Sequence, residues 1–218
     1  MEKVREAVVF LIALVLSIAV HEFGHAFSAD KLGDRTPRLQ GRVTLNPIAH
    51  ADPIGTLLLP LMMVLFSPGM LFGWGRPVQI NPMAFTRKLR MKTAHLIVAA
   101  AGPAMNVLLA LLVTVLLKVL LMAGVLDKNP AIIDGIAMVV RLNWILCFFN
   151  LIPIPPLDGG AVLAGLLPDR YSRHLDLLNQ YGMFILIGLL VTGALRIFLW
   201  PAMQIWTFSM ELIGLRFI

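Results

Sequence analysis

The chain has 218 residues, of which 59% are hydrophobic and only 14% are charged, and its mean hydropathy is +0.86. An average soluble domain is roughly 45–50% apolar and about 25% charged. This composition excludes a disordered chain, a collagen-like chain and an ordinary cytosolic enzyme. It predicts an integral membrane protein.

The net charge is +6, and half of the eighteen Lys and Arg residues gather in two loops. One loop holds Lys31, Arg35, Arg38 and Arg42, and the other holds Arg76, Arg87, Lys88, Arg90 and Lys92. Basic loops beside apolar spans are typical of the cytoplasmic face of a membrane, so we expect no nucleic-acid partner. The single cysteine, Cys147, lies in an apolar run and excludes an intrachain disulfide and a cysteine-based zinc cluster.

Long apolar runs follow one another along the chain at about Ala7–Phe27, Ile54–Trp74, His95–Met122, Ile132–Ile152 and Tyr181–Trp200. Each is at least as long as the ~20 residues that cross a bilayer. The first run has no small-residue cleavage site and ends in ionisable residues, so we interpret it as a helix and not as a signal peptide. Pro201 is expected to separate the fifth run from a short apolar tail. The sequence predicts an all-α polytopic membrane protein, a bundle of about four to six transmembrane helices in a single domain, residues 1–218.

The second run contains Pro60 and Pro68, which interrupt a helix. If this run spans the membrane, the two basic loops fall on opposite faces, against the positive-inside tendency. If it dips in and returns, both loops are cytoplasmic and the amino terminus lies outside. Before it, Gly41–Leu45 alternates like a short strand. We therefore predict a re-entrant segment with a short β-hairpin after the first helix.

The end of the first run carries the pattern H-E-x-x-H, in which His21 and His25 lie on one helical face. Two imidazoles in this arrangement can bind one Zn²⁺, and Glu22 is placed to take a proton from an activated water. The alternative is a pair of interfacial histidines with a snorkelling glutamate. Ionisable groups inside a bilayer are costly, which favours the functional interpretation.

A catalytic zinc needs a third protein ligand and an open position. Asp158 is the candidate, because it follows a proline-rich stretch, Pro153–Pro156, that cannot form a regular helix. Irregular backbone at membrane depth can expose its polar groups to a substrate. The alternative is an Asp-Gly turn that caps a helix.

Together these motifs resemble the site-2 proteases, the intramembrane zinc metalloproteases. That family carries an H-E-x-x-H helix, then A-G-P-x-x-N, present here as Ala101–Asn106, then N-x-x-P-x-P-P-L-D-G-G, present here as Asn150–Gly160. The segment Thr44–Gly55 resembles the T-L-N-P-x-x-H-x-D-P-x-G of the short prokaryotic members. No PDZ or CBS segment is recognised within the chain.

The resemblance implies that His21, His25 and Asp158 bind zinc and that Glu22 is the general base. It also implies that Asn150 and Asn106 hold the substrate backbone or the developing oxyanion. For Asn106, a hydrogen bond between membrane helices is an equal alternative. The expected activity is hydrolysis of peptide bonds in a membrane-spanning peptide or protein, within the lipid bilayer of a prokaryotic cell membrane, with the active site toward the cytoplasmic side.

Two further residues and two further functions stay open at this point. His50 could join the site or stabilise the turn before Asp52-Pro53, and Arg141 could snorkel, contact substrate or precede a later helix start. A zinc hydrolase acting on a lipid or a prenylated peptide would share the H-E-x-x-H pattern. A non-proteolytic zinc protein, an adaptor or carrier, would retain the fold without turnover.

Overall fold

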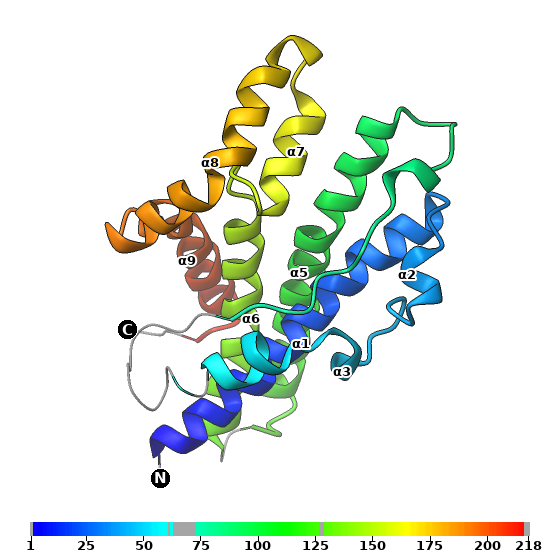
Figure 1. Cartoon of the computed structure of the whole chain (residues 1–218). Coiled ribbons are helices and arrows are strands. Elements are labelled where there is room, and N and C mark those ends of the chain that lie inside the picture. The colour runs from blue at the N-terminus through cyan, green and yellow to red at the C-terminus, as the bar shows by residue number, and fades with distance from the viewer. Residues whose placement is uncertain (1, 61, 63–72, 127–128, 216–218) are drawn as a thin grey trace.

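The computed structural model describes residues 2–60, 62, 73–126 and 129–215, and among these it contains helices and no strand (Figure 1). The longer helices are α1 (Glu2–Lys31), α5 (Met91–Met122), α6 (Pro130–Asn150), α7 (Asp158–Leu166), α8 (Ser172–Val191) and α9 (Leu195–Leu212). The short elements are α2 (Thr36–Leu39), α3 (Pro47–His50), the π-helix η1 (Pro53–Leu58), and the 3-10 turns η2 (Pro82–Ala84) and η3 (Asp169–Tyr171). The helical class expected from the composition is confirmed.

Helices α1 and α5 cross at the centre of the molecule and run antiparallel (Figure 1). Near the end of α1, Ala29 is buried together with Ala94 and Val98 from the start of α5. One turn deeper, Gly24 faces Ala101, and a Cβ on Gly24 would lie 2.6 Å from the Ala101 carbonyl oxygen. Small residues at the crossing allow the two backbones to approach closely, as is common between membrane helices.

Helix α6 completes the bundle by packing on α1, α5 and α9. Leu142 of α6 joins a buried cluster with Phe10 and Leu14 of α1. A larger cluster combines Ala110 and Leu117 (α5), Ala137, Val140 and Trp144 (α6), and Ala202, Trp206 and Met210 (α9). Helices α7 and α8 form a hairpin that projects from this bundle in Figure 1, and α7 contacts α5.

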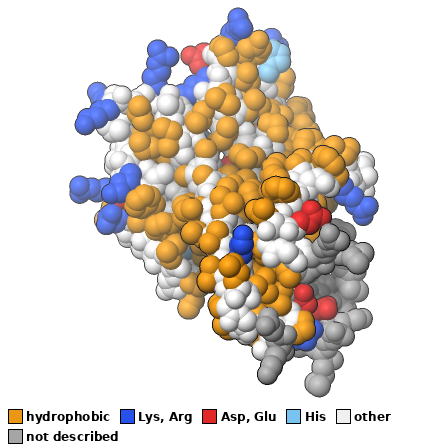
Figure 2. Space-filling model, turned by 180° about the vertical axis from the view of Figure 1, so that it is seen from behind, with side chains coloured by type: hydrophobic (Ala, Val, Ile, Leu, Met, Phe, Trp, Pro, Cys, Tyr) orange, Lys and Arg blue, Asp and Glu red, His pale blue; other side chains and the backbone are white. Residues whose placement is uncertain are grey.

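Four helices of the described chain are long and apolar enough to cross a membrane: Arg5–Lys31, Met91–Met122, Pro130–Asn150 and Asp169–Val191. Figure 2 shows a face covered largely by hydrophobic side chains, with most Lys and Arg side chains toward its periphery. A surface of this kind is unfavourable in water and favourable in lipid. The chain is therefore an integral membrane protein.

The strand predicted at Gly41–Leu45 is wrong, because these residues form a turn and bends. The N–H of Gly41 donates to Arg38 O (3.0 Å), and the N–H of Arg42 donates to Pro37 O (2.8 Å). Gly41 has φ +67°, a left-handed value that closes this turn. The backbone thus bonds back onto α2 and not to a partner strand. In the predicted re-entrant segment Ile54–Trp74, residues 61 and 63–72 lie outside the described residues, so a re-entrant path stays a prediction and a β-hairpin is not supported.

The fifth predicted span, Tyr181–Trp200, also differs from the structure. Helix α8 ends at Val191, and Gly193, at φ +73°, reverses the chain before α9 begins at Leu195. Pro201 does not end a helix but lies inside α9. Proline is tolerated in membrane helices where neighbouring groups satisfy the backbone.

Candidate metal centre

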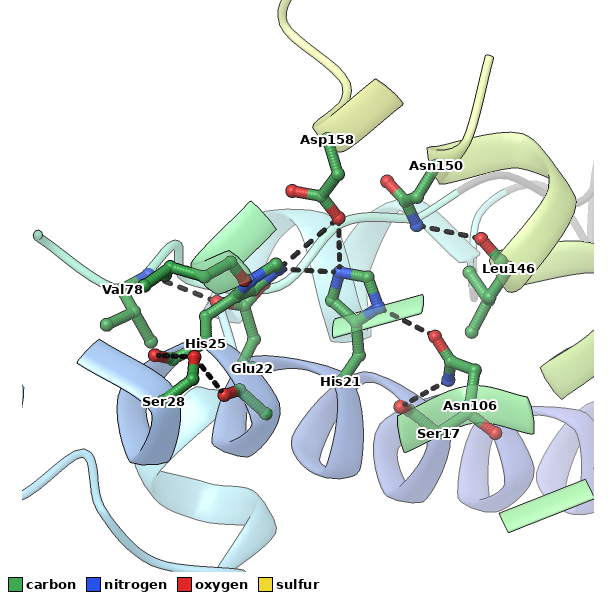
Figure 3. A network of polar contacts seen from close by, with 12 residues as sticks. Ser17, His21, Glu22, His25, Ser28, Val78, Asn106, Leu146, Asn150 and Asp158 are labelled. Atoms are coloured by element: carbon green, nitrogen blue, oxygen red, sulfur yellow. Dashed lines mark hydrogen bonds and ion pairs between the residues drawn. The ribbon is translucent and has the colours of Figure 1, made fainter. Parts of the chain in front are cut away.

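Three potential metal ligands from distant parts of the chain meet between α1 and the start of α7 (Figure 3). The Nε2 atoms of His21 and His25 are 3.1 Å apart. Asp158 Oδ2 lies 3.1 Å from His21 Nε2 and 3.3 Å from His25 Nε2. Both histidines are buried, and Asp158 Oδ2 is a buried oxygen that accepts no hydrogen bond within the described chain.

These distances fit a zinc ion. With Zn–N and Zn–O bonds of about 2.0–2.2 Å, two ligand atoms of a tetrahedral site are about 3.3–3.6 Å apart. Two of the observed separations, both 3.1 Å, lie just below this range, and the third, 3.3 Å, lies at its lower limit. Two imidazole nitrogens and one carboxylate also make up a typical donor set of a catalytic zinc site, which leaves a fourth position open.

In each imidazole, the hydrogen-bond partner of Nδ1 determines which nitrogen carries the proton. His25 Nδ1 lies 2.8 Å from Val98 O, a backbone carbonyl that can only accept, so Nδ1 is the protonated atom. His21 Nδ1 lies 2.6 Å from Asn106 Oδ1 and is protonated for the same reason. Both Nε2 lone pairs are therefore directed toward Asp158. Three electron-pair donors facing one another repel unless a cation or protons lie between them.

A buried polar network holds Asn106 in the orientation that His21 requires. Asn106 Nδ2 donates to Ser17 O (3.2 Å) and to Asn143 Oδ1 (2.8 Å). Asn143 Nδ2 donates in turn to Val139 O and to Ser17 Oγ, each at 2.8 Å. Because Ser17 O and Val139 O are backbone acceptors, both amides have only one consistent orientation. The network thus orients His21 through hydrogen bonds outside the ligand set.

Asp158 reaches the histidines because the backbone before it is irregular. Residues 151–157 form turns and bends, as their prolines predicted, and Asp158 is the first residue of α7. A Cβ on Gly159 would collide with the carbonyl oxygens of Leu151 and Ile152, so only glycine allows α7 to start this close to the preceding turn. Among the described residues no side-chain hydrogen bond caps α7, and the Asp158 carboxylate faces the histidines.

Gly102 of α5 provides the space for the two imidazoles. A Cβ at this position would overlap His25 Nε2 and would lie 2.7 Å from His21 Cε1. The glycine of the A-G-P-x-x-N segment is thus the point at which α5 passes directly against the histidine pair. The sequence identified this segment as a motif but did not predict that its glycine would contact the two imidazole rings.

Glu22 lies beside the histidines on α1 and is partly buried (Figure 3). Its Oε2 accepts a hydrogen bond of 3.1 Å from Val78 N, in the extended segment 73–81. The sequence did not predict this contact between the H-E-x-x-H motif and the segment 73–81. The second carboxylate oxygen, Oε1, takes part in no hydrogen bond within the described chain.

The two asparagines predicted to bind substrate lie in different surroundings. Asn106 is completely buried, and its described hydrogen bonds are those that orient His21, which fits the interhelical alternative. Asn150, at the end of α6, donates from Nδ2 to Leu146 O (3.0 Å), and its oxygen points away from that helix (Figure 3). A substrate contact by either asparagine stays a prediction.

His50 and Arg141 lie outside the cluster of ligands. His50 is fully buried, its Nε2 donates to Thr44 O (2.8 Å), and its own carbonyl accepts from Arg76 N (2.9 Å). It therefore stabilises the loop around α3. Arg141 is exposed, with its guanidinium carbon 5.4 Å from the centre of the Trp206 ring, a cation–π contact on the bundle surface.

Comparisons with known proteins agree with this centre. A model of peptidase family M50 matches residues 9–139 and 127–190. The Bacillus subtilis (strain 168) protein named "Putative zinc metalloprotease YwhC" is 36% identical over 198 residues, which cover 89% of this chain and 85% of that protein. "Putative zinc metalloprotease Rip2" of Mycolicibacterium smegmatis is 33% identical over 183 residues, 84% of this chain and 66% of that protein. Its Mycobacterium tuberculosis (strain H37Rv) counterpart is 32% identical over 197 residues, 89% and 68% of the two chains.

No solved structure matches the chain. The family match extends over most of the chain, including the segments that hold the His21, His25 and Asp158 cluster. The relatives are named for zinc, the metal that this donor set fits, and zinc is the cofactor. On these grounds the chain belongs to peptidase family M50, the site-2 proteases.

Proposed function

We propose that the chain is an intramembrane zinc metalloprotease that hydrolyses peptide bonds of membrane-spanning proteins. The observation that carries this proposal is the convergence of Asp158 with His21 and His25, which lie on a helix apolar enough to span a bilayer. Buried ionisable groups at such a depth are costly and are by default functional. His21, His25 and Asp158 would hold the ion, and the fourth position would face the substrate.

When bound, zinc would polarise the scissile carbonyl and lower the pKa of water toward about 7. Glu22 is the general base of the proposed reaction. Its free Oε1 takes the proton of the attacking water while Oε2 stays on Val78 N. The water oxygen bonds to the carbonyl carbon, and Glu22 then gives the proton to the amide nitrogen as the C–N bond breaks.

Asn150 would hold the substrate backbone. One N–H of its Nδ2 donates to Leu146 O, and its oxygen points away from the helix and can accept from a peptide N–H (Figure 3). A scissile segment must leave its helical hydrogen bonds to expose a carbonyl, and an acceptor here would stabilise the unwound form. Asn106 would act through His21 and not on the substrate.

The active site would lie toward the cytoplasmic side of a prokaryotic cell membrane. The chain leaves the bundle at the end of α1 and returns at the start of α5, and Thr86 N–H donates to Leu32 O (2.6 Å), which joins these two ends. The basic residues next to these two ends, Lys31 and Arg35 at and after the end of α1 and Arg87, Lys88 and Arg90 before α5, would therefore lie on one face, the face that the positive-inside tendency makes cytoplasmic. His21 lies ten residues before Lys31, about 15 Å from this face at the rise of an α-helix.

Metal analysis and peptide cleavage by the purified protein in detergent test the proposal. We expect one zinc per chain in the wild type, retained in Glu22→Gln and lost or strongly weakened in Asp158→Ala. The wild type should cut a membrane-spanning peptide inside its apolar segment, and Glu22→Gln should not. Full activity of Glu22→Gln would remove its assigned role. Zinc binding that needs Asp158, with no cleavage of any membrane peptide, would instead indicate a non-proteolytic adaptor or carrier.

A further inference from the structure

A cleft of about 440 Å³ lies between the loop around α3 and the extended segment that follows residue 72. Its lining includes Gln40, Arg42, Ile48, Ala49, Arg76 and Gln79. Two hydrogen bonds hold its walls together, from Arg76 N to His50 O (2.9 Å) and from Gln40 Nε2 to Gln79 Oε1 (2.8 Å). The cleft is therefore a fixed feature of the loop region and is separate from the metal ligands.

Two guanidinium groups of like charge line this cleft. Arg42 is only 6% exposed, and its Nη1 donates to Ala49 O, one of the five N–H donors that a guanidinium carries. Arg76 is exposed, and neither arginine forms an ion pair within the described chain. Burial lowers the pKa of Arg42, the charge of Arg76 lowers it further, and Glu22 opposes the shift. A buried arginine beside a second one is stabilised when an anion enters.

The cleft shares a wall with the proposed catalytic base. Arg76 lies two residues before Val78, whose N–H donates to Glu22 Oε2 (Figure 3). The neighbouring Gly75 packs between His50 and Glu22, since a Cβ there would lie 3.2 Å from His50 O and 3.8 Å from Glu22 Cγ. At the rise of an extended chain, two residues correspond to about 6–7 Å. A group held in the cleft is thus within two or three peptide residues of a bond placed at Glu22.

We propose that Arg42 and Arg76 bind a carboxylate of the peptide substrate, two or three residues from the bond that is cleaved. This subsite rests on the proposed proteolytic function and adds a substrate preference to it. The carboxylate is supplied by an Asp or Glu side chain or by a free chain terminus. Arg42 is the buried anchor of the pair, and Arg76 is the exposed partner that closes over the anion.

The surroundings favour a peptide carboxylate as the anion. Guanidinium forks match the planar geometry of a carboxylate and bind it in a bidentate manner. The side-chain amides of Gln40 and Gln79 lie in the same cleft and offer donors and acceptors to a peptide backbone. Because the cleft lies next to Glu22, an anion bound there would belong to the same peptide chain that is cleaved.

Peptide binding by the zinc-stripped full chain in detergent tests the subsite without catalysis. The probe is a fluorescent leucine-rich membrane-spanning peptide with one Glu at successive flanking positions, compared with its Gln counterpart, and each is made with a free or an amidated carboxyl terminus. We expect a carboxylate at one position to tighten binding about tenfold, the effect of a charge-assisted hydrogen bond. A gain from Glu identifies a side chain as the source, and a gain from the free terminus identifies the terminus.

Arg42→Gln and Arg76→Gln should abolish this preference, while Arg35→Gln, which removes an exposed charge from the same loop, should keep it. If Arg42→Gln does not fold, Arg76→Gln carries the test, because its side chain is exposed. Equal binding of all peptides, or a preference retained in Arg76→Gln, would overturn the proposal. So would variants that lose affinity for phosphatidylglycerol vesicles but bind the peptides unchanged, since the anion would then be a lipid phosphate.

The zinc-loaded protein with the same peptides separates this proposal from the proposed function. An acidic preference in binding without any cleavage would contradict proteolysis and leave the carboxylate subsite standing. Cleavage with no acidic preference would leave proteolysis standing and refute the subsite.

Discussion

Substitution of Gly102 by alanine tests the metal centre with a single methyl group. The added Cβ would lie 2.7 Å from His21 Cε1, whereas ordinary contact begins at 3.4 Å, so this ring must retreat by about 0.7 Å. The ring of His25 would be displaced as well, because it also overlaps the new atom. Zinc sites tolerate deviations of about 0.2 Å in ligand distances. We therefore expect Gly102→Ala to weaken zinc binding by about 10- to 100-fold.

The assay is competition for zinc between the purified protein and a chromophoric chelator, with helix content followed by circular dichroism. Gly188→Ala is the matched control, because this helical glycine of α8 has open space around it. Both substitutions gain similar helix propensity, about 1 kcal/mol at most. Only Gly102→Ala should lose zinc affinity. A zinc Kd for Gly102→Ala within about twofold of that of Gly188→Ala would refute the packing argument.

Two further substitutions test the support of the site. Asn143→Leu removes an acceptor of the Asn106 amide, and we expect zinc affinity to fall about 10- to 100-fold in the same competition assay; an unchanged Kd would contradict the network. Asp34→Ala leaves Thr36 N and Asn81 N without their carboxylate acceptor, and because both hydrogen bonds are only partly buried, the cost is at most about 1–3 kcal/mol for each. It should lower the Tm without changing zinc stoichiometry, and loss of zinc would show that the loop and the metal centre are coupled.

The ligands could be predicted from sequence because local rules determine most of their arrangement. Helical spacing alone places His21 and His25 on one face. The prolines before Asp158 exclude a regular helix, and the structure has turns and bends over residues 151–157. The need for a third zinc ligand made Asp158 a candidate, and the resemblance to a known family then joined the two segments in one predicted site. His25 and Asp158 are 133 residues apart in the sequence, and such a separation does not by itself indicate contact.

The support of the site was missed because it depends on which helix faces which. Ser17 and Asn143 are single polar residues in apolar runs, a signal that marks interhelical hydrogen bonds but does not identify the partner. The strand expected at Gly41–Leu45 failed because alternation alone ignores the turn that Gly41 closes onto α2. The run expected at Tyr181–Trp200 failed because Gly193 has a stronger effect on the backbone than the surrounding apolar residues.

Which nitrogen of each histidine carries the proton is determined only in the assembled helix bundle. Asn143 donates to the backbone of its own helix and to Ser17, Asn106 donates to Asn143 and to the backbone of Ser17, and His21 donates to Asn106. Each donor is turned away from the centre, so the last group in the series, His21 Nε2, presents a lone pair to it. His25 reaches the same state through Val98 O alone. With the hydrogen bonds arranged in this way, the acceptor atoms of the two histidines and of Asp158 face one another in the interior of the bundle. This arrangement is stable when a cation binds between them.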